Sequence, residues 1–177
     1  HPLYIISSFV FGALVMIPQW IFLLVPLYFC MVTAPNLLGQ YRANKDNQFT
    51  ILLPVSRDDV VKARILAFSL LELIHIGFTF LFMLLHHVVY QGGANFGFDL
   101  NSAYIGMTCL IFGVFNFVLF PTYYKTAEAF GVPVIIATLV ATLIAATAEG
   151  SAMISPSYAR LMEQVPIMQL FVLIFGI

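Results

Sequence analysis

"PLYIISSFVFGALVMIPQWIFLLVPLYFCMVTAPNLLGQ", residues 2–40, contains no Asp, Glu, Lys or Arg. A helix needs about 20 apolar residues to cross a membrane core of about 30 Å. As one helix this stretch would measure about 58 Å, nearly twice that thickness. The best place for it to fold back is Pro18-Gln19-Trp20, because proline interrupts a helix and tryptophan favours the membrane interface. The stretch therefore predicts two membrane spans joined by a short turn.

The rest of the chain has the same apolar character. Hydrophobic residues make up 62% of the sequence and charged residues 8%, whereas a soluble domain has about 25% charged residues. The 177 residues leave room for about five or six crossings. The net charge of -1 argues against nucleic acid as a partner, because contact with phosphates needs clustered cations. Cys30 and Cys109 lie in apolar runs and indicate buried hydrophobic residues, with neither a disulfide nor a metal site.

The apolar runs predict an all-α, polytopic membrane protein with a single transmembrane domain over residues 1–177. Six helical spans are expected, of which the sixth is incomplete. They lie near residues 3–17, 20–39, 60–85, 103–121, 131–148 and 166–177. The polar, glycine-containing stretch 86–101 is expected to be a loop.

The positive charges predict how the chain is oriented in the membrane. Five of the seven Lys and Arg residues lie between Arg42 and Arg64. Because short loops rich in Lys and Arg stay on the cytoplasmic side, this loop and Lys125 are placed inside, and only Arg160 outside. We therefore expect a multi-pass protein of the cytoplasmic membrane, surrounded by lipid, with both termini in the cytoplasm.

The loop over residues 41–58 has more structure than a charged anchor requires. Residues 44–53 are expected to form a short helix that exposes apolar side chains such as Phe49 to the cytoplasm, and an exposed apolar patch marks a docking site. Pro54 ends this element. Ser56 is the expected N-cap of the next helix, with an acidic residue three positions later as in a capping box. The alternative interpretation is that the loop serves only as a topology anchor.

"LPVSRDDVVKARIL", residues 53–66, and the preceding "NKDNQF" resemble a known signature. It is the Leu-Pro-x-Ser-Arg motif, followed by a hydrophobic-Val-x-x-Lys/Arg pattern, of bacterial permeases in the type-2 ATP-binding-cassette exporter family. Within that family the chain most resembles the small six-span permeases of the phenol-soluble-modulin exporter type. The matching positions are Pro54, Ser56, Arg57, Val61 and Arg64, with Arg in place of the commoner Lys at 64.

The resemblance implies a coupling helix around residues 44–56, seated in a groove of a cytoplasmic ATPase. It also implies that two permeases, as a homodimer, and two ATPases make one exporter. The residues expected to contact the ATPase are Asn44, Lys45, Asp46, Phe49, Leu52, Leu53, Pro54, Ser56, Arg57 and Asp58. The expected activity is export of an amphipathic or hydrophobic substrate, peptides included, by alternating access.

ATP hydrolysis is not expected on this chain. The sequence contains no G-x-x-x-x-G-K-[ST] motif, which would cradle the phosphates of ATP. We therefore expect a subunit that is not an enzyme and holds no cofactor, with ATP and Mg²⁺ bound by the partner ATPase.

Glu72 and His75 are ionisable residues within the third expected span. They lie three positions apart and share a helix face, and Glu72 lies about 10 Å deeper in the membrane than Ile65. An ionisable side chain at that depth is a candidate functional residue. A metal site would need further ligands, which are not evident, so a proton relay and a hydrogen-bonded packing pair remain, and the packing pair is favoured. The relay would make the chain an ion-coupled secondary transporter or channel, which is the alternative function.

Small residues on the fifth expected span predict close helix packing, either within the chain or between two permeases. They recur every four positions, at Ala137, Ala141 and Ala145. On the outer side, one interpretation of Glu149, Arg160 and Glu163 is that they gate a substrate exit, and simple solvation is the favoured interpretation. The sequence assigns no residue to substrate binding.

Overall fold

The computed structural model describes residues 2–17, 21–44, 56–90, 100–126, 129–155 and 157–158. Within these ranges the chain is helical and contains no strand, which confirms the all-α prediction. The elements are α1 (Pro2–Ala13), the 3-10 helix η1 (Leu14–Met16), α2 (Leu24–Ala43), α4 (Arg57–Tyr90), α5 (Ser102–Lys125) and α6 (Gly131–Ile154).

Most of the observed helices extend beyond the predicted spans. The helix α4 begins at Arg57 and continues to Tyr90, so residues 86–90 are helical and not part of a loop as predicted. In contrast, α2 begins at Leu24, four residues later than the predicted start at residue 20. The predicted break at 18–20 and the predicted sixth span, 166–177, lie outside the described residues.

Three of the described helices, α4, α5 and α6, are long and apolar enough to cross a membrane, and Pro2–Met16 forms a shorter apolar helix. The second predicted span does not join them. Although α2 has 20 residues, Asn36, Gln40 and two prolines lower its hydrophobicity. The structure thus supports a multi-pass membrane protein but does not confirm six spans.

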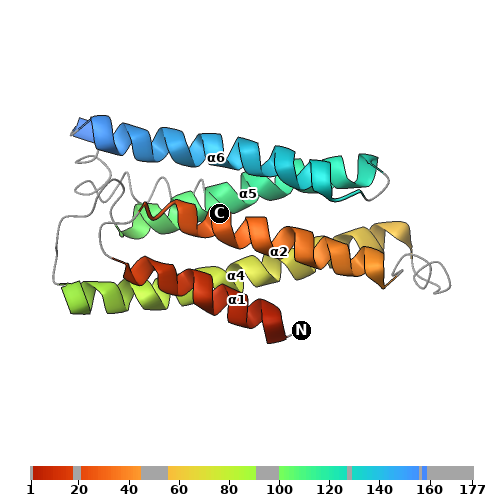
Figure 1. Ribbon diagram of the computed structural model, residues 1–177, viewed down its shortest axis with the longest axis horizontal. Coiled ribbons are helices and arrows are strands. Elements are labelled where there is room, and N and C mark those ends of the chain that lie inside the picture. The colour runs from red at the N-terminus through yellow and green to blue at the C-terminus, as the bar shows by residue number, and fades with distance from the viewer. Residues whose placement is uncertain are drawn as a thin grey trace.

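The helices form two pairs with α2 between them (Figure 1). One pair is α1 with α4, and the other is α5 with α6; these two contacts are the most extensive in the chain. The contact between α4 and α5 is much smaller. Two subassemblies of helices therefore meet largely through α2.

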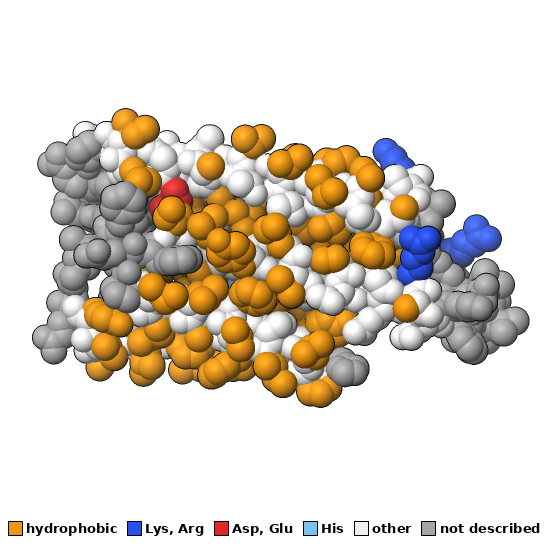
Figure 2. Space-filling model, viewed as in Figure 1, with side chains coloured by type: hydrophobic (Ala, Val, Ile, Leu, Met, Phe, Trp, Pro, Cys, Tyr) orange, Lys and Arg blue, Asp and Glu red, His pale blue; other side chains and the backbone are white. Residues whose placement is uncertain are grey.

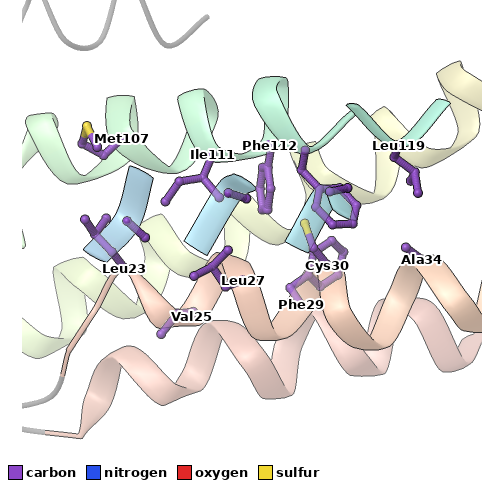
Figure 3. Close-up of a cluster of buried hydrophobic side chains, with 14 of the residues drawn as sticks. Leu23, Val25, Leu27, Phe29, Cys30, Ala34, Met107, Ile111, Phe112 and Leu119 are labelled. Atoms are coloured by element: carbon purple, nitrogen blue, oxygen red, sulfur yellow. The ribbon is translucent and has the colours of Figure 1, made fainter. Parts of the chain in front are cut away.

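Buried aromatic and aliphatic side chains from α2 fill the space beside α5. In Figure 3, Phe29 and Cys30 of α2 point toward Phe112 of α5. The rings of Phe29 and Phe112 lie 5.9 Å apart between centroids, a separation at which aromatic rings attract each other. Apolar packing of this kind fixes α2 against α5 in the middle of the bundle.

The outer surface of the bundle carries many large hydrophobic side chains. On α4, Leu66 and Leu73 are exposed, and so is Phe117 on α5. Such a surface would be costly in water but suits contact with lipid chains. In Figure 2, Lys and Arg side chains gather at one end of the molecule, the end where α2 finishes and α4 begins in Figure 1.

Candidate functional site

The predicted coupling segment lies between the end of α2 and the start of α4. Asn44 is the C-cap of α2, and its backbone N–H donates to the carbonyl of Gln40. Arg57 and Asp58 form the exposed first turn of α4. The remaining predicted contact residues lie outside the described part of the chain: Lys45, Asp46, Phe49, Leu52, Leu53 and Pro54.

Ser56 starts α4 as its pattern predicts. The backbone N–H of Asp59 donates to the Ser56 hydroxyl oxygen at 3.2 Å. In turn the hydroxyl donates to the Asp59 carboxylate at 2.7 Å. A serine at this position satisfies one of the N–H groups that every helix start leaves without an intrahelical partner. The first turn of α4 is thus fixed directly after the coupling segment.

Arg64 joins the two helices that flank the coupling segment. Its guanidinium carbon lies 4.9 Å from the centre of the Tyr41 ring, and the Arg64 side chain is only 5% exposed. A guanidinium over an aromatic face is attracted by the negative potential of the ring. The sequence pattern includes Arg64, but nothing in it pairs Arg64 with Tyr41. This contact between α2 and α4 could be found only from the packing of the two helices.

His75 is completely buried at the centre of the bundle. Its Nδ1 lies 3.3 Å from the carbonyl oxygen of Ser8 on α1, and because a carbonyl only accepts, Nδ1 carries a hydrogen. Its Nε2 lies 3.4 Å from the Thr79 hydroxyl, which can donate to it. The ring also stacks on Phe29, with 4.4 Å between centroids. A neutral imidazole satisfies all of these contacts.

Glu72 points to a different neighbour from His75. Its side chain is 4% exposed, and its Oε2 accepts a hydrogen bond of 2.6 Å from the amide nitrogen of Asn116 on α5. A charged carboxylate at the centre of a bilayer costs about 3 kcal/mol on insertion scales. No hydrogen bond joins Glu72 to His75 in the described part of the chain, so the shared helix face does not make them a pair.

Asn116 was not predicted as a site residue. The available signal was its amide within the otherwise apolar fourth span, since polar groups inside a membrane helix need a partner. Within the described ranges, no group of three or more His, Cys, Asp or Glu side chains is placed to hold a metal ion.

The predicted small-residue stripe on α6 faces the interior of this chain. Ala137, Ala141 and Ala145 are all buried, and α6 makes its largest contact with α5. Small side chains allow two helices to approach closely where lipid supplies no hydrophobic drive for association. The three alanine side chains are thus covered by other helices of the same chain.

Glu149 is buried, contrary to the favoured prediction that it is simply solvated. It is 4% exposed, and its Oε1 accepts a hydrogen bond of 3.0 Å from the backbone N–H of Leu23, the N-cap of α2. Leu23 has no side chain that could cap α2, so the carboxylate from α6 takes that role. Beside it, a pocket of about 260 Å³ lies between α2 and α6.

These elements define a polytopic helical membrane protein with a charged segment at one end of the bundle. A family model described as ABC-2 family transporter protein matches residues 2–177, so the chain belongs to the ABC-2 transporter family. Subunits of this family are membrane proteins, and membership implies association with an ATP-binding-cassette ATPase partner. Neither the comparison with curated proteins nor the comparison with solved structures found a match.

Proposed function

We propose that the chain is the permease subunit of an ATP-driven exporter that moves an amphipathic or hydrophobic substrate, peptides included, out of the cell. Family membership supports the permease role. The resemblance of residues 53–66 to small permeases of the phenol-soluble-modulin exporter type supports the substrate class. In this proposal the permease acts as a homodimer with two ATPases, and ATP and Mg²⁺ bind to the ATPases.

The observation that carries the coupling mechanism is the continuity of α4. This helix runs unbroken for 34 residues from Arg57, which corresponds to about 51 Å. Because it begins directly after the coupling segment, a displacement of the segment by the ATPase would move the whole helix. Arg64 over Tyr41 would move the end of α2 with it. The pair of α1 and α4 would then rock against the pair of α5 and α6, giving alternating access.

The test replaces two apolar side chains of the coupling segment, which would contact the ATPase, with acidic ones. The double variant Phe49→Asp with Leu53→Asp should lose co-purification with the ATPase and lose ATP-driven transport. The matched control, Phe49→Leu with Leu53→Ile, keeps apolar side chains at both positions and should retain both properties. If the Asp variant assembles and transports normally, residues 44–56 are not the coupling element.

The alternative function, an ion-coupled secondary transporter or channel, is favoured by one observation, the burial of Glu72 within a membrane helix. In that case the purified permease alone, reconstituted in liposomes, should transport in response to a pH gradient. Glu72→Gln should abolish this transport. Under the exporter proposal the permease alone is inactive, and transport requires the ATPase and ATP.

A further inference from the structure

The interface between α4 and α5 contains polar oxygen atoms that lack hydrogen-bond partners. The atoms are Oε1 of Glu72 and Oδ1 of Asn116, and both are shielded from solvent. The two side chains already touch, since the Asn116 amide nitrogen donates to Oε2 of Glu72 at 2.6 Å. In each of the two side chains, one polar atom is therefore hydrogen-bonded and the other, an oxygen, is not.

A third buried oxygen atom without a hydrogen-bond partner, on Thr33, lies at the same depth in the bundle as Glu72 and Asn116. His75 packs against Phe29 of α2 and Phe112 of α5. One helical turn from this aromatic layer, in the direction of the charged end, are Glu72 on α4, Asn116 on α5 and Thr33 on α2. The Thr33 hydroxyl is also buried without a hydrogen-bond partner. A polar layer thus lies next to the aromatic layer.

Counting donors and acceptors shows what the pair of Glu72 and Asn116 lacks. An ionised carboxylate only accepts hydrogen bonds, and the Asn116 carbonyl oxygen also only accepts. With Glu72 ionised, the pair holds more acceptors than the Asn116 amide can satisfy, and burial without a partner is costly for each of them. A single additional hydrogen on the Glu72 carboxyl group would give the Asn116 oxygen its donor.

We propose that Glu72 is a proton-binding site, in which the carboxyl group stays protonated at neutral pH and pairs with Asn116. The acid hydroxyl donates to the Asn116 carbonyl oxygen, while the Asn116 amide donates to the other carboxyl oxygen. Of these two bonds, the one from the Asn116 amide to Glu72 is already formed at 2.6 Å. The two-bond pair links the α1 and α4 pair to the α5 and α6 pair, beside the aromatic contact of Phe68 on α4 with Phe115 on α5.

The groups around Glu72 offer no competing charge. On α4, the two nitrogen atoms of His75 face Ser8 and Thr79. From α2 and α5, the thiols of Cys30 and Cys109 lie within electrostatic range of the carboxyl group. In the described ranges no ion pair to Glu72 is formed, so a proton is the simplest neutralising partner.

Infrared difference spectroscopy tests the proposal without the ATPase or any substrate, so its outcome is independent of the proposed exporter function. The purified permease and its Glu72→Gln variant are compared in phosphatidylcholine vesicles at neutral pH. The expected result is loss of a carbonyl band of a protonated carboxyl group. As a control, Asp58→Asn replaces an exposed carboxyl group at the start of α4 and should leave the band of the protonated acid in place. Loss of carboxylate bands in Glu72→Gln would overturn the proposal.

Two further arms distinguish the alternatives. In Asn116→Leu the acid band should persist and move to higher frequency, since its hydrogen-bond acceptor is gone; an unmoved band would exclude Asn116 as the partner. Adding sodium to the unmodified protein should leave the acid band unchanged, and its disappearance would indicate a cation site instead. Glu72→Gln should also fold, because a Gln amide can make the same two bonds, so failure to fold would count against the neutral pair.

Discussion

Arg64 is a buried cation whose guanidinium lies over the Tyr41 ring, and this contact predicts the effect of replacing either residue. Arg64→Ala should lower the free energy of unfolding by about 1 kcal/mol, the usual size of a cation–π contact. It should also weaken the link between α2 and α4, so that ATPase activity of the assembled exporter responds less to substrate. Thermal unfolding in detergent and substrate-stimulated ATP hydrolysis are the measurements.

The Tyr41 side of the contact provides matched variants. Tyr41→Phe retains the ring and should behave like the unmodified protein, whereas Tyr41→Leu retains bulk without the π face and should resemble Arg64→Ala. If Tyr41→Phe is as damaging as Tyr41→Leu, the hydroxyl group and not the ring face is what matters at this position.

At the scale of residues, the sequence identifies which polar side chains lie in the membrane but not what they contact. Spacing places Glu72 and His75 on one face of a helix, and both are buried there. Their partners lie on other helices: Asn116 is 44 residues from Glu72 in the sequence, and Ser8, whose carbonyl contacts His75, is 67 residues away. Such pairings depend on which helices are neighbours, and helical periodicity carries no information on that.

At the scale of elements, Gly12 determines how closely α1 approaches α4. A Cβ atom at Gly12 would lie 3.2 Å from both the Phe78 Cβ and the Thr79 backbone nitrogen. Gly12→Leu should therefore force the two helices apart and destabilise the protein by about 1–3 kcal/mol, as overpacking does. The loss would appear as a lower unfolding temperature in detergent.

Gly77 is the control for this substitution, because it lies in the middle of α4 and a Cβ there meets no atom within 4 Å. Gly77→Leu should be neutral or slightly stabilising, since leucine favours helix by about 0.8 kcal/mol relative to glycine. Equal destabilisation by both substitutions would mean that the approach of α1 to α4 does not set the cost.

The start of α4 gives a second prediction at this scale. Ser56→Ala removes the hydroxyl that accepts from the Asp59 N–H and should cost about 1 kcal/mol of helix stability. Ser56→Thr keeps a hydroxyl group and should retain most of it. Hydrogen exchange of the first-turn amides measures the effect directly, and unchanged exchange in Ser56→Ala would show that the hydroxyl does not hold this turn.

At the scale of the whole molecule, apolar runs predict the order and approximate position of the first five helices. They do not predict that α1 joins α4 and α5 joins α6, because the pairing of helices depends on side-chain shape over whole surfaces. The second predicted span is also not among the described helices that are apolar enough to cross a membrane. The reason is that two prolines and several polar residues fall within α2. These residues are tolerated because neighbouring helices cover one side of α2, where Thr33 and Leu37 are buried.

The charged end of the bundle is expected to lie in the cytoplasm, and cysteine labelling at the two ends can test this orientation. The helix α5 has 24 residues, from Ser102 to Lys125, or about 36 Å, enough to place these exposed residues on opposite sides of a core of about 30 Å. In intact cells, a membrane-impermeant thiol reagent should label Ser102→Cys and leave Lys125→Cys and Asp58→Cys unlabelled until the cells are opened. The native Cys30 is buried and Cys109 is partly buried, so the unsubstituted protein supplies the background signal. Labelling of Asp58→Cys in intact cells would place the coupling segment outside, where no ATPase could reach it.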